Sequence, residues 1–115
     1  MSNIASALAV LGYNEEAIIQ YDKVLQLDEN DLDTLYNKGK SLTEFGLDDD
    51  AISCFDKILA VEPNFLDAIT GKGIILLSRG KFDSAVALFD RALEIDPNNH
   101  IAKDNKKLAL EMSGR

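Results

Sequence analysis

The stretch that decides the fold is LYNKGKSLTEFGLDDDAISCFDKILAVEPN, residues 35–64, because residues 69–98 follow the same pattern as ITGKGIILLSRGKFDSAVALFDRALEIDPN. A Lys-Gly pair, a later glycine, an Ala-x3-Phe-Asp group and a final acidic-Pro-Asn triplet all recur 34 positions further on. A fixed period of this length indicates a chain assembled from consecutive copies of one supersecondary unit.

Each copy has the spacing of two helices joined by a turn. Leu35, Gly39 and Leu42 recur at steps of four and three, which places them on one helical face. Gly46 then predicts the end of that helix. A second apolar face follows, and Pro63 ends it.

Small and aromatic residues recur at fixed places in the copies. Gly39 and Ala51 are expected where the two helices of one copy approach each other. We expect Phe55 and Phe89 to fill the space between neighbouring copies. Since glycine inside a helix costs about 1 kcal/mol relative to alanine, its recurrence favours a packing role. Side chains that can cap the following helices are Asp31, Asn64 and Asn98.

The pattern extends more weakly toward residue 1, where Gly12, Ala17, Tyr21 and Leu25 hold matching positions. Helices are therefore expected along the whole chain, with boundary errors of about two to four residues. The seven expected helices span residues 2–11, 14–27, 31–45, 48–61, 65–79, 82–95 and 99–112.

The motif resembles the tetratricopeptide repeat, whose signature is Trp-x2-Leu-Gly-x2-Tyr, then Ala-x3-Phe, then Pro. The resemblance covers essentially the whole chain. An aliphatic residue replaces the tryptophan, lysine replaces the first leucine, and leucine replaces the tyrosine; the first copy departs further and begins about three residues into the motif. The matching segments are Leu35-x2-Lys38-Gly39-x2-Leu42 with Ala51-x3-Phe55 and Pro63, and Ile69-x2-Lys72-Gly73-x2-Leu76 with Ala85-x3-Phe89 and Pro97.

This resemblance implies an all-α fold, a right-handed α-α superhelix of about three units, forming a single domain over residues 1–115. The units would span about residues 1–31, 32–65 and 66–99. A C-terminal helix over 100–113 would then solvate the last unit, because an array cannot leave its end face bare. That helix carries Ile101, Leu108 and Met112 as its apolar residues.

The resemblance also implies a function, since such proteins are non-enzymatic interaction modules that bind partners in a concave groove lined by the first helix of each unit. Asn37 holds the place where family members often hydrogen-bond a ligand backbone. The family phase also turns four further residues toward this groove, namely Thr43, Glu44, Gly71 and Ser78. The groove residues that the family phase implies are Asp33, Tyr36, Asn37, Lys40, Asp67, Thr70, Ile74 and Leu77.

The chemistry of this set indicates what the groove could hold. One subfamily grips the C-terminal carboxylate of a peptide with lysines, asparagines and an arginine, but Asp67 and Gly71 stand at two of those positions here. Because a carboxylate would meet Asp67, we reject that clamp. A partner segment with basic and apolar residues suits the polar, mildly acidic and partly apolar set better.

The apolar run from Ile74 to Leu77 leaves two interpretations open. Ile75 is expected to pack toward the neighbouring helix pair, and Leu76 to match Leu42 in the core. Ile74 and Leu77 either look into the groove or contact Leu108 and Met112 of the end helix. Apolar residues are more often core than ligand contacts, which favours the second interpretation.

Other candidate sites do not fit their motifs. Gly80-Lys81 lacks the preceding glycine and the following Ser or Thr of a phosphate loop. The acidic run over 28–33 lacks the glycine of a calcium loop. One histidine, His100, and one cysteine, Cys54, cannot assemble a zinc site or a nucleophile–base pair. We therefore expect no metal, no cofactor and no catalysis.

The amino-acid composition limits the classes of partner that we expect. The net charge of −8, concentrated in residues 1–62, favours solubility and disfavours nucleic acid and anionic membranes. The lone Cys54 is compatible with a reducing cytoplasm. Two alternatives stay open beside a peptide-binding module: self-assembly into a homo-oligomer through end surfaces, and a regulatory piece of a larger protein.

Overall fold

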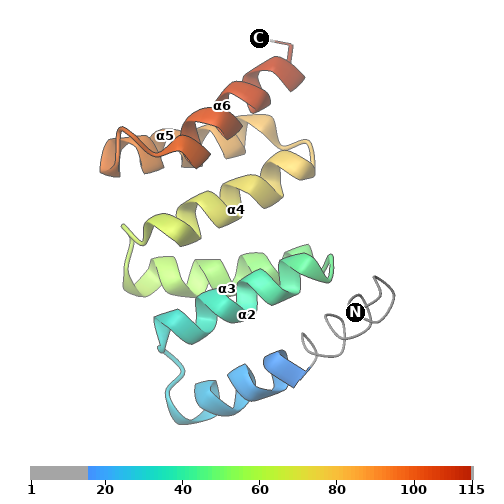
Figure 1. Cartoon of the computed structure of the whole chain (residues 1–115), viewed down its shortest axis with the longest axis vertical. Helices are drawn as coiled ribbons and strands as arrows, with labels where there is room; N and C mark the ends of the chain where they lie inside the picture. The colour runs from blue at the N-terminus through green and yellow to red at the C-terminus, as the bar shows by residue number, and fades with distance from the viewer. Residues whose placement is uncertain (1–15, 115) are drawn as a thin grey trace, which may run out of the picture.

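The computed structural model describes residues 16–114, and within that range it has six helices and no strand. The helices stack in chain order along the longest axis of the molecule (Figure 1). Residues 16–27 form the first described helix, and the expected helix over 2–11 lies outside the described residues. The others are α2 (Leu32–Glu44), α3 (Asp48–Val61), α4 (Leu66–Ser78), α5 (Phe82–Ile95) and α6 (His100–Met112).

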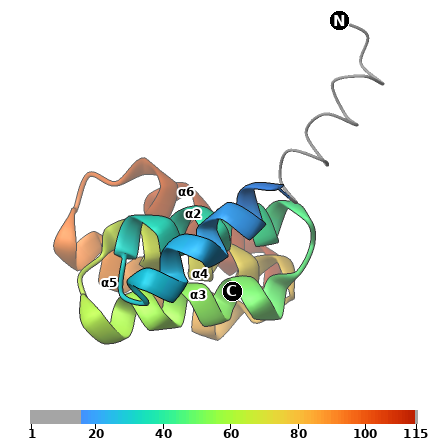
Figure 2. The same cartoon turned by 90° about the horizontal axis from the view of Figure 1, so that it is seen from below.

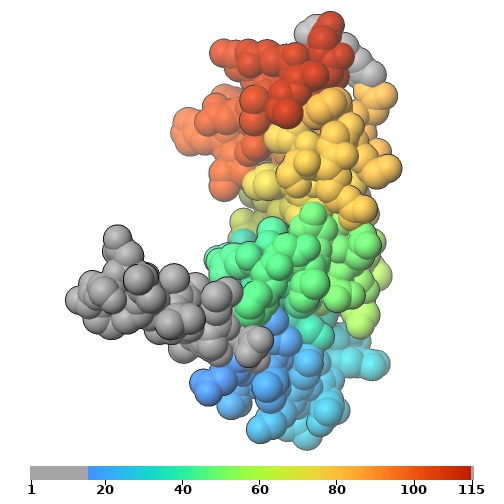
Figure 3. Space-filling view, turned by 90° about the vertical axis from the view of Figure 1, so that its right-hand side faces the viewer, coloured from blue at the N-terminus to red at the C-terminus, as the bar shows by residue number. Residues whose placement is uncertain are grey.

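The arrangement is the helical-repeat solenoid that the sequence predicts. α2 packs against α3 and α4 against α5, while α3 contacts α4 between the two pairs. Seen along the stack, the helices overlap within one outline (Figure 2), and the space-filling view shows the chain progressing from one end to the other without a gap (Figure 3). The bounds of α3 and α5 are those expected, and the other labelled helices differ by one residue at one or both ends.

Glycines turn the chain between the paired helices. Gly46 and Gly80 each adopt a φ of 77°, a left-handed conformation that side chains with a Cβ rarely take. In each turn the next residue donates its N–H back to the helix, from Leu47 to the carbonyl of Leu42 and from Lys81 to that of Leu76, both at 2.9 Å. These bonds satisfy carbonyls that the helix end leaves open.

Two of the expected helix caps are wrong by one residue. Asp31 caps α2 as expected, accepting from the N–H of Thr34 at 3.1 Å. α6 is capped by Asn99, which accepts from Ala102 at 2.8 Å. Asn98 and Asn64 are not the caps, because each lies in the turn that precedes the N-cap residue.

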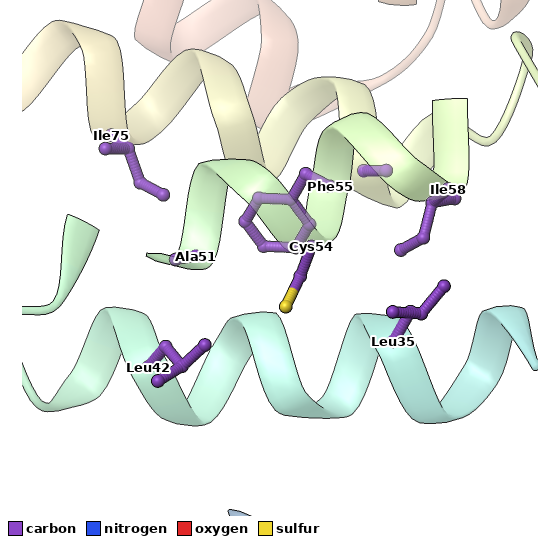
Figure 4. Packing of buried hydrophobic residues seen from close by; sticks show 8 residues of the cluster. Leu35, Leu42, Ala51, Cys54, Phe55, Ile58 and Ile75 are labelled. Carbon is purple, nitrogen blue, oxygen red and sulfur yellow. The ribbon is translucent and has the colours of Figure 1, made fainter. Parts of the chain in front are cut away.

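The Phe55 side chain packs between neighbouring units. It projects from α3 and is only 2% exposed. A Cβ added at Gly39 of α2 would lie 2.8 Å from its Cε1, and one added at Gly71 of α4 would lie 3.0 Å from its Cζ. The aromatic residue therefore fills the space between units, as expected, and Ile75 joins the same cluster from the next unit (Figure 4).

α6 packs with a different face from the one expected. Its buried residues are Ala102 and Ala109, which belong to the second core cluster with Phe89 of α5. The apolar residues Ile101, Leu108 and Met112 are exposed instead, by 50%, 44% and 56%. Small alanines let the last helix approach α5 closely, so the larger side chains are left on the outside.

An ion-pair ladder follows the repeat along the stack. Each pair joins the second helix of one unit to the helix that follows it, and the lysine stands where the family signature has leucine. Such partly exposed pairs contribute about 0–1 kcal/mol each. The pairs are Lys38–Asp22 at 2.6 Å, Lys72–Asp56 at 2.7 Å and Lys106–Asp90 at 2.6 Å.

Candidate functional site

The first helices of two successive units, α2 and α4, are in contact and carry the expected groove residues. Asp33, Asn37 and Lys40 are exposed on α2, and Asp67 is exposed in the first turn of α4. Both aspartates lie at helix N-termini, where the helix dipole stabilises negative charge. The structure thus brings polar residues from two units onto neighbouring helices.

Tyr36 is the centre of this surface. Its ring is half-buried, with ring centroids 6.1 Å from those of Phe55 and Phe65, each pair inclined at 44°. These distances and tilts suit attractive aromatic pairing. Lys40 places its ammonium 5.6 Å from the Tyr36 ring centroid, within the range of a cation–π contact. The ring is therefore held from two sides.

Asp67 acts on Tyr36 from the neighbouring unit. Burial first, and then the negative charge of Asp67, raise the pKa of the Tyr36 hydroxyl above its ordinary value. The phenol is protonated at neutral pH, as an ordinary tyrosine is, and can donate a hydrogen bond. The same interaction indicates that the Asp67 carboxylate and the Tyr36 side chain share one local environment.

A pocket of about 230 Å³ opens beside Tyr36, between α2 and α4. Phe55 of α3 contributes its floor, and Ile74 of α4, which is 39% exposed, forms a wall. The Thr43 hydroxyl donates to the Gly39 carbonyl at 2.8 Å, so its hydrogen bond is made inside the helix. The lining residues are Tyr36, Lys40, Thr43, Glu44, Phe55, Gly71 and Ile74.

Two of the expected groove residues do not reach the open surface. Thr70 is 5% exposed, and its hydroxyl donates to the carbonyls of Leu66 and Asp67, both at 3.2 Å. Leu77 is also 5% exposed and belongs to the core cluster that contains residues of α6. Leu77 is therefore a core residue, in a cluster with Ala102 and Ala109 and without the expected Leu108 and Met112. Ile74 lies at the pocket.

Sequence reasoning missed two aromatic contributors. The repeat predicts Phe55 only as a packing residue between units, although its ring also lines the pocket. Phe65 was not considered, because it precedes α4 and lies outside the helical phase of the groove. An aromatic residue directly after a Pro-Asn turn is the signal that could have drawn attention to it.

Further features bear on other classes of site. No group of three or more potential metal ligands occurs among residues 16–114. Within the same range no helix combines the length and apolarity of a membrane span. A hollow of about 530 Å³, lined by Ile18, Ile19, Leu42, Phe45 and Leu47, lies between the helix over 16–27 and the end of α2.

Comparison with solved structures identifies similar folds. The first TPR of Spaghetti (RPAP3), bound to an HSP90 peptide, is 21% identical with a TM-score of 0.85, covering 90% of this chain and 82% of that one. The Arabidopsis OM64 TPR domain is 20% identical with a TM-score of 0.83, covering 92% and 88%. YrrB, described as a TPR protein with an unusual peptide-binding site, is 25% identical with a TM-score of 0.78, and this chain covers 53% of it.

Comparison of the sequence gives the family. No match was found among curated proteins. Tetratricopeptide repeat families match three consecutive segments, residues 1–31, 32–65 and 67–99. These matches span most of the sequence, and the second and third coincide with the helix pairs α2/α3 and α4/α5, so the chain belongs to the tetratricopeptide repeat family.

Proposed function

We propose that this chain is a non-enzymatic interaction module that binds a peptide segment of a partner protein across α2 and α4. The observation that carries the proposal is the pocket between these helices, which joins apolar walls from Tyr36 and Ile74 to exposed polar residues on either side. Binding of this kind needs only surface complementarity, so the proposal includes no cofactor and no catalytic step.

Relatives support the general role. One similar domain is described in complex with an HSP90 peptide and another, the second TPR domain of human RPAP3, with an HSP70 peptide. YrrB is described as having an unusual peptide-binding site. These descriptions concern proteins of low sequence identity, so they support peptide binding as a class and leave the partner to the chemistry of this groove.

That chemistry favours a segment with basic and apolar residues. Asp33 and Asp67 are exposed in the first turns of α2 and α4, the two helices that carry the pocket. Charge complementarity steers a basic segment toward such a surface and disfavours an acidic one. Asn37, exposed on α2, would hydrogen-bond the backbone of the bound segment.

The net charge and the single cysteine bear on the class of partner and on the location of the protein. A net charge of −8 favours a protein partner over nucleic acid or an anionic membrane. The lone, buried Cys54 supports a reducing, cytoplasmic location. A role as a regulatory part of a larger protein is compatible with this binding activity.

An affinity capture from cell extract tests the proposal. The wild type is compared with a double variant, Tyr36→Ala with Ile74→Asp, which removes one wall of the pocket and charges the other. The control is Ile95→Asp, which changes an isoleucine of α5 that is 38% exposed, close to the 39% of Ile74. We expect the double variant to lose partners that the control retains, with all proteins folded by circular dichroism. Equal capture by all three proteins would show that the groove is assigned wrongly.

Self-association is a second candidate, favoured by the exposed apolar residues of α6. Ile101, Leu108 and Met112 would pack against the hollow that contains Ile19 and Leu47 in a second copy. Such a head-to-tail contact generates rings or filaments.

Light scattering over a concentration series tests this second candidate. Mass should rise with concentration for the wild type and stay monomeric for Leu108→Glu. A constant monomer mass for the wild type would exclude it.

A further inference from the structure

The geometry points to a socket in the groove that takes one apolar side chain of the partner, opened by Gly71 and flanked by a site for a basic residue. The inference rests on the proposed function and names the chemistry of the segment that would be bound. The socket is the pocket of about 230 Å³ between α2 and α4.

Gly71 distinguishes this place from its equivalents in the other units. The residues at the same repeat position are Asn37 on α2 and Asn105 on α6, and only α4 has glycine there. A Cβ at Gly71 would lie 3.0 Å from Cζ and 3.2 Å from Cε2 of Phe55, so even the smallest side chain would stand against that ring. An asparagine would cover the floor that glycine leaves open.

The lining suits an apolar occupant. Its lining includes the Tyr36 ring and the Ile74 side chain, and the Lys40 ammonium is already engaged with the Tyr36 ring, 5.6 Å from its centroid. The Thr43 hydroxyl already donates to the Gly39 carbonyl. An apolar side chain would therefore enter without leaving that hydroxyl unpaired.

The volume sets the size of the occupant. A dry apolar cavity of about 150 Å³ holds a benzene molecule. The 230 Å³ of this pocket therefore accommodates one side chain of the size of leucine, methionine or phenylalanine. A second large side chain would have to bind elsewhere on the surface.

The carboxylates beside the socket indicate which residue of the partner would lie next to the apolar one. Asp67 lies close enough to Tyr36 to raise the pKa of its hydroxyl, and Asp33 is exposed in the first turn of α2. Both are at the N-terminal ends of their helices, to one side of the socket. A lysine or arginine of the partner would bind on that side, next to the apolar anchor.

Selection of short random peptides displayed on phage tests the inference, with the wild-type chain as bait. We expect the selected peptides to share one Leu, Met or Phe with a Lys or Arg close by. Replacement of that apolar residue by alanine should weaken binding about 10- to 100-fold, as expected for burying a side chain of that size.

Variants of the chain then locate the contact. Ile74→Asn leaves the core intact because Ile74 is partly exposed, whereas Gly71→Ala fills the socket and also presses on Phe55. Both should weaken binding about tenfold or more, since each removes apolar contact area. Ile95→Asn on α5 is the matched control, because Ile95 is 38% exposed, and it should bind as the wild type does.

The outcomes separate this inference from the proposed function. Selected peptides that lose affinity for Asn37→Ala but bind Ile74→Asn and Gly71→Ala normally would overturn the socket and leave groove binding intact. Selected peptides without a shared apolar residue would also overturn the socket. Failure to select any peptide would count against both the socket and the proposed function.

Discussion

The Phe55 ring approaches Gly39 so closely that a Cβ at that glycine would lie 2.8 Å from the ring. Real Cβ atoms essentially never come so near, so the ring and the helix backbone are matched in shape. Gly73 has the same relationship with Phe89, at 2.7 Å. The repeat of the sequence is therefore a repeat of one packing contact.

Gly39→Ala should destabilise the protein by about 1–3 kcal/mol, because the added methyl group overpacks the core against Phe55. Helix propensity alone would give the opposite sign, since alanine is favoured over glycine by about 1 kcal/mol. Urea denaturation measures the difference, with Ser84→Ala on the exposed face of α5 as control. A stabilised Gly39→Ala variant would contradict the packing account.

Leu77→Ala should cost about 2–5 kcal/mol, the usual range for truncating a buried leucine. Leu108→Ala should cost much less, because Leu108 is 44% exposed on α6. The free energies of unfolding of the two variants are compared in the same denaturant series. If both substitutions cost the same small amount, Leu77 is not the core residue described above.

The ion pair of Lys72 with Asp56 should show a small coupling energy. Both groups are partly exposed, so a double-mutant cycle with alanine should give about 0.2–1 kcal/mol. The coupling should decrease as salt is added, because the charges are accessible to solvent. A coupling that is large and insensitive to salt would mean that the pair is shielded from water.

Cys54 should be protected from alkylation in the folded protein. Burial raises the pKa of its thiol above the ordinary 9.0, so the reactive thiolate is disfavoured. Iodoacetamide should react slowly with the native chain and quickly in urea. Fast modification of the native protein would contradict this burial.

The raised pKa of Cys54 also predicts a loss of stability at alkaline pH. The folded state holds the thiol proton more tightly, so its contribution is fully present below pH 9.0 and is lost as pH rises through the folded pKa. Tyr36, whose pKa is also raised, contributes with the same sign. Comparison with Cys54→Ala isolates the thiol, and an identical alkaline decline in both proteins would rule out its share.

The sequence was a good guide wherever the repeat determines local structure. The bounds of α3 and α5, and the turns at Gly46 and Gly80, follow from residue spacing and from glycine conformation. The N-caps were harder, because the turn before α6 uses Asn98 and leaves capping to Asn99. Adjacent residues of the same type give no local signal that separates those roles.

The groove was predicted less completely. Ile74 and Leu77 are both apolar and belong to one helix, yet Leu77 packs in the core with α6 while Ile74 borders the pocket. Their difference depends on which neighbouring helix each side chain meets, which helical periodicity alone does not specify. The outward face of α6 was misjudged for the same reason, since the small residues Ala102 and Ala109 make the contact.

The central claim is that the surface shared by α2 and α4 binds a peptide. Its most direct test is a titration of the isotope-labelled chain with a peptide selected as above, followed by the backbone amide signals in NMR spectra. If the peptide binds there, the largest shifts occur at Tyr36, Lys40, Gly71 and Ile74, while signals of α6 around Ile101 stay in place. Shifts concentrated on α6, with the α2 and α4 signals unchanged, would contradict this claim.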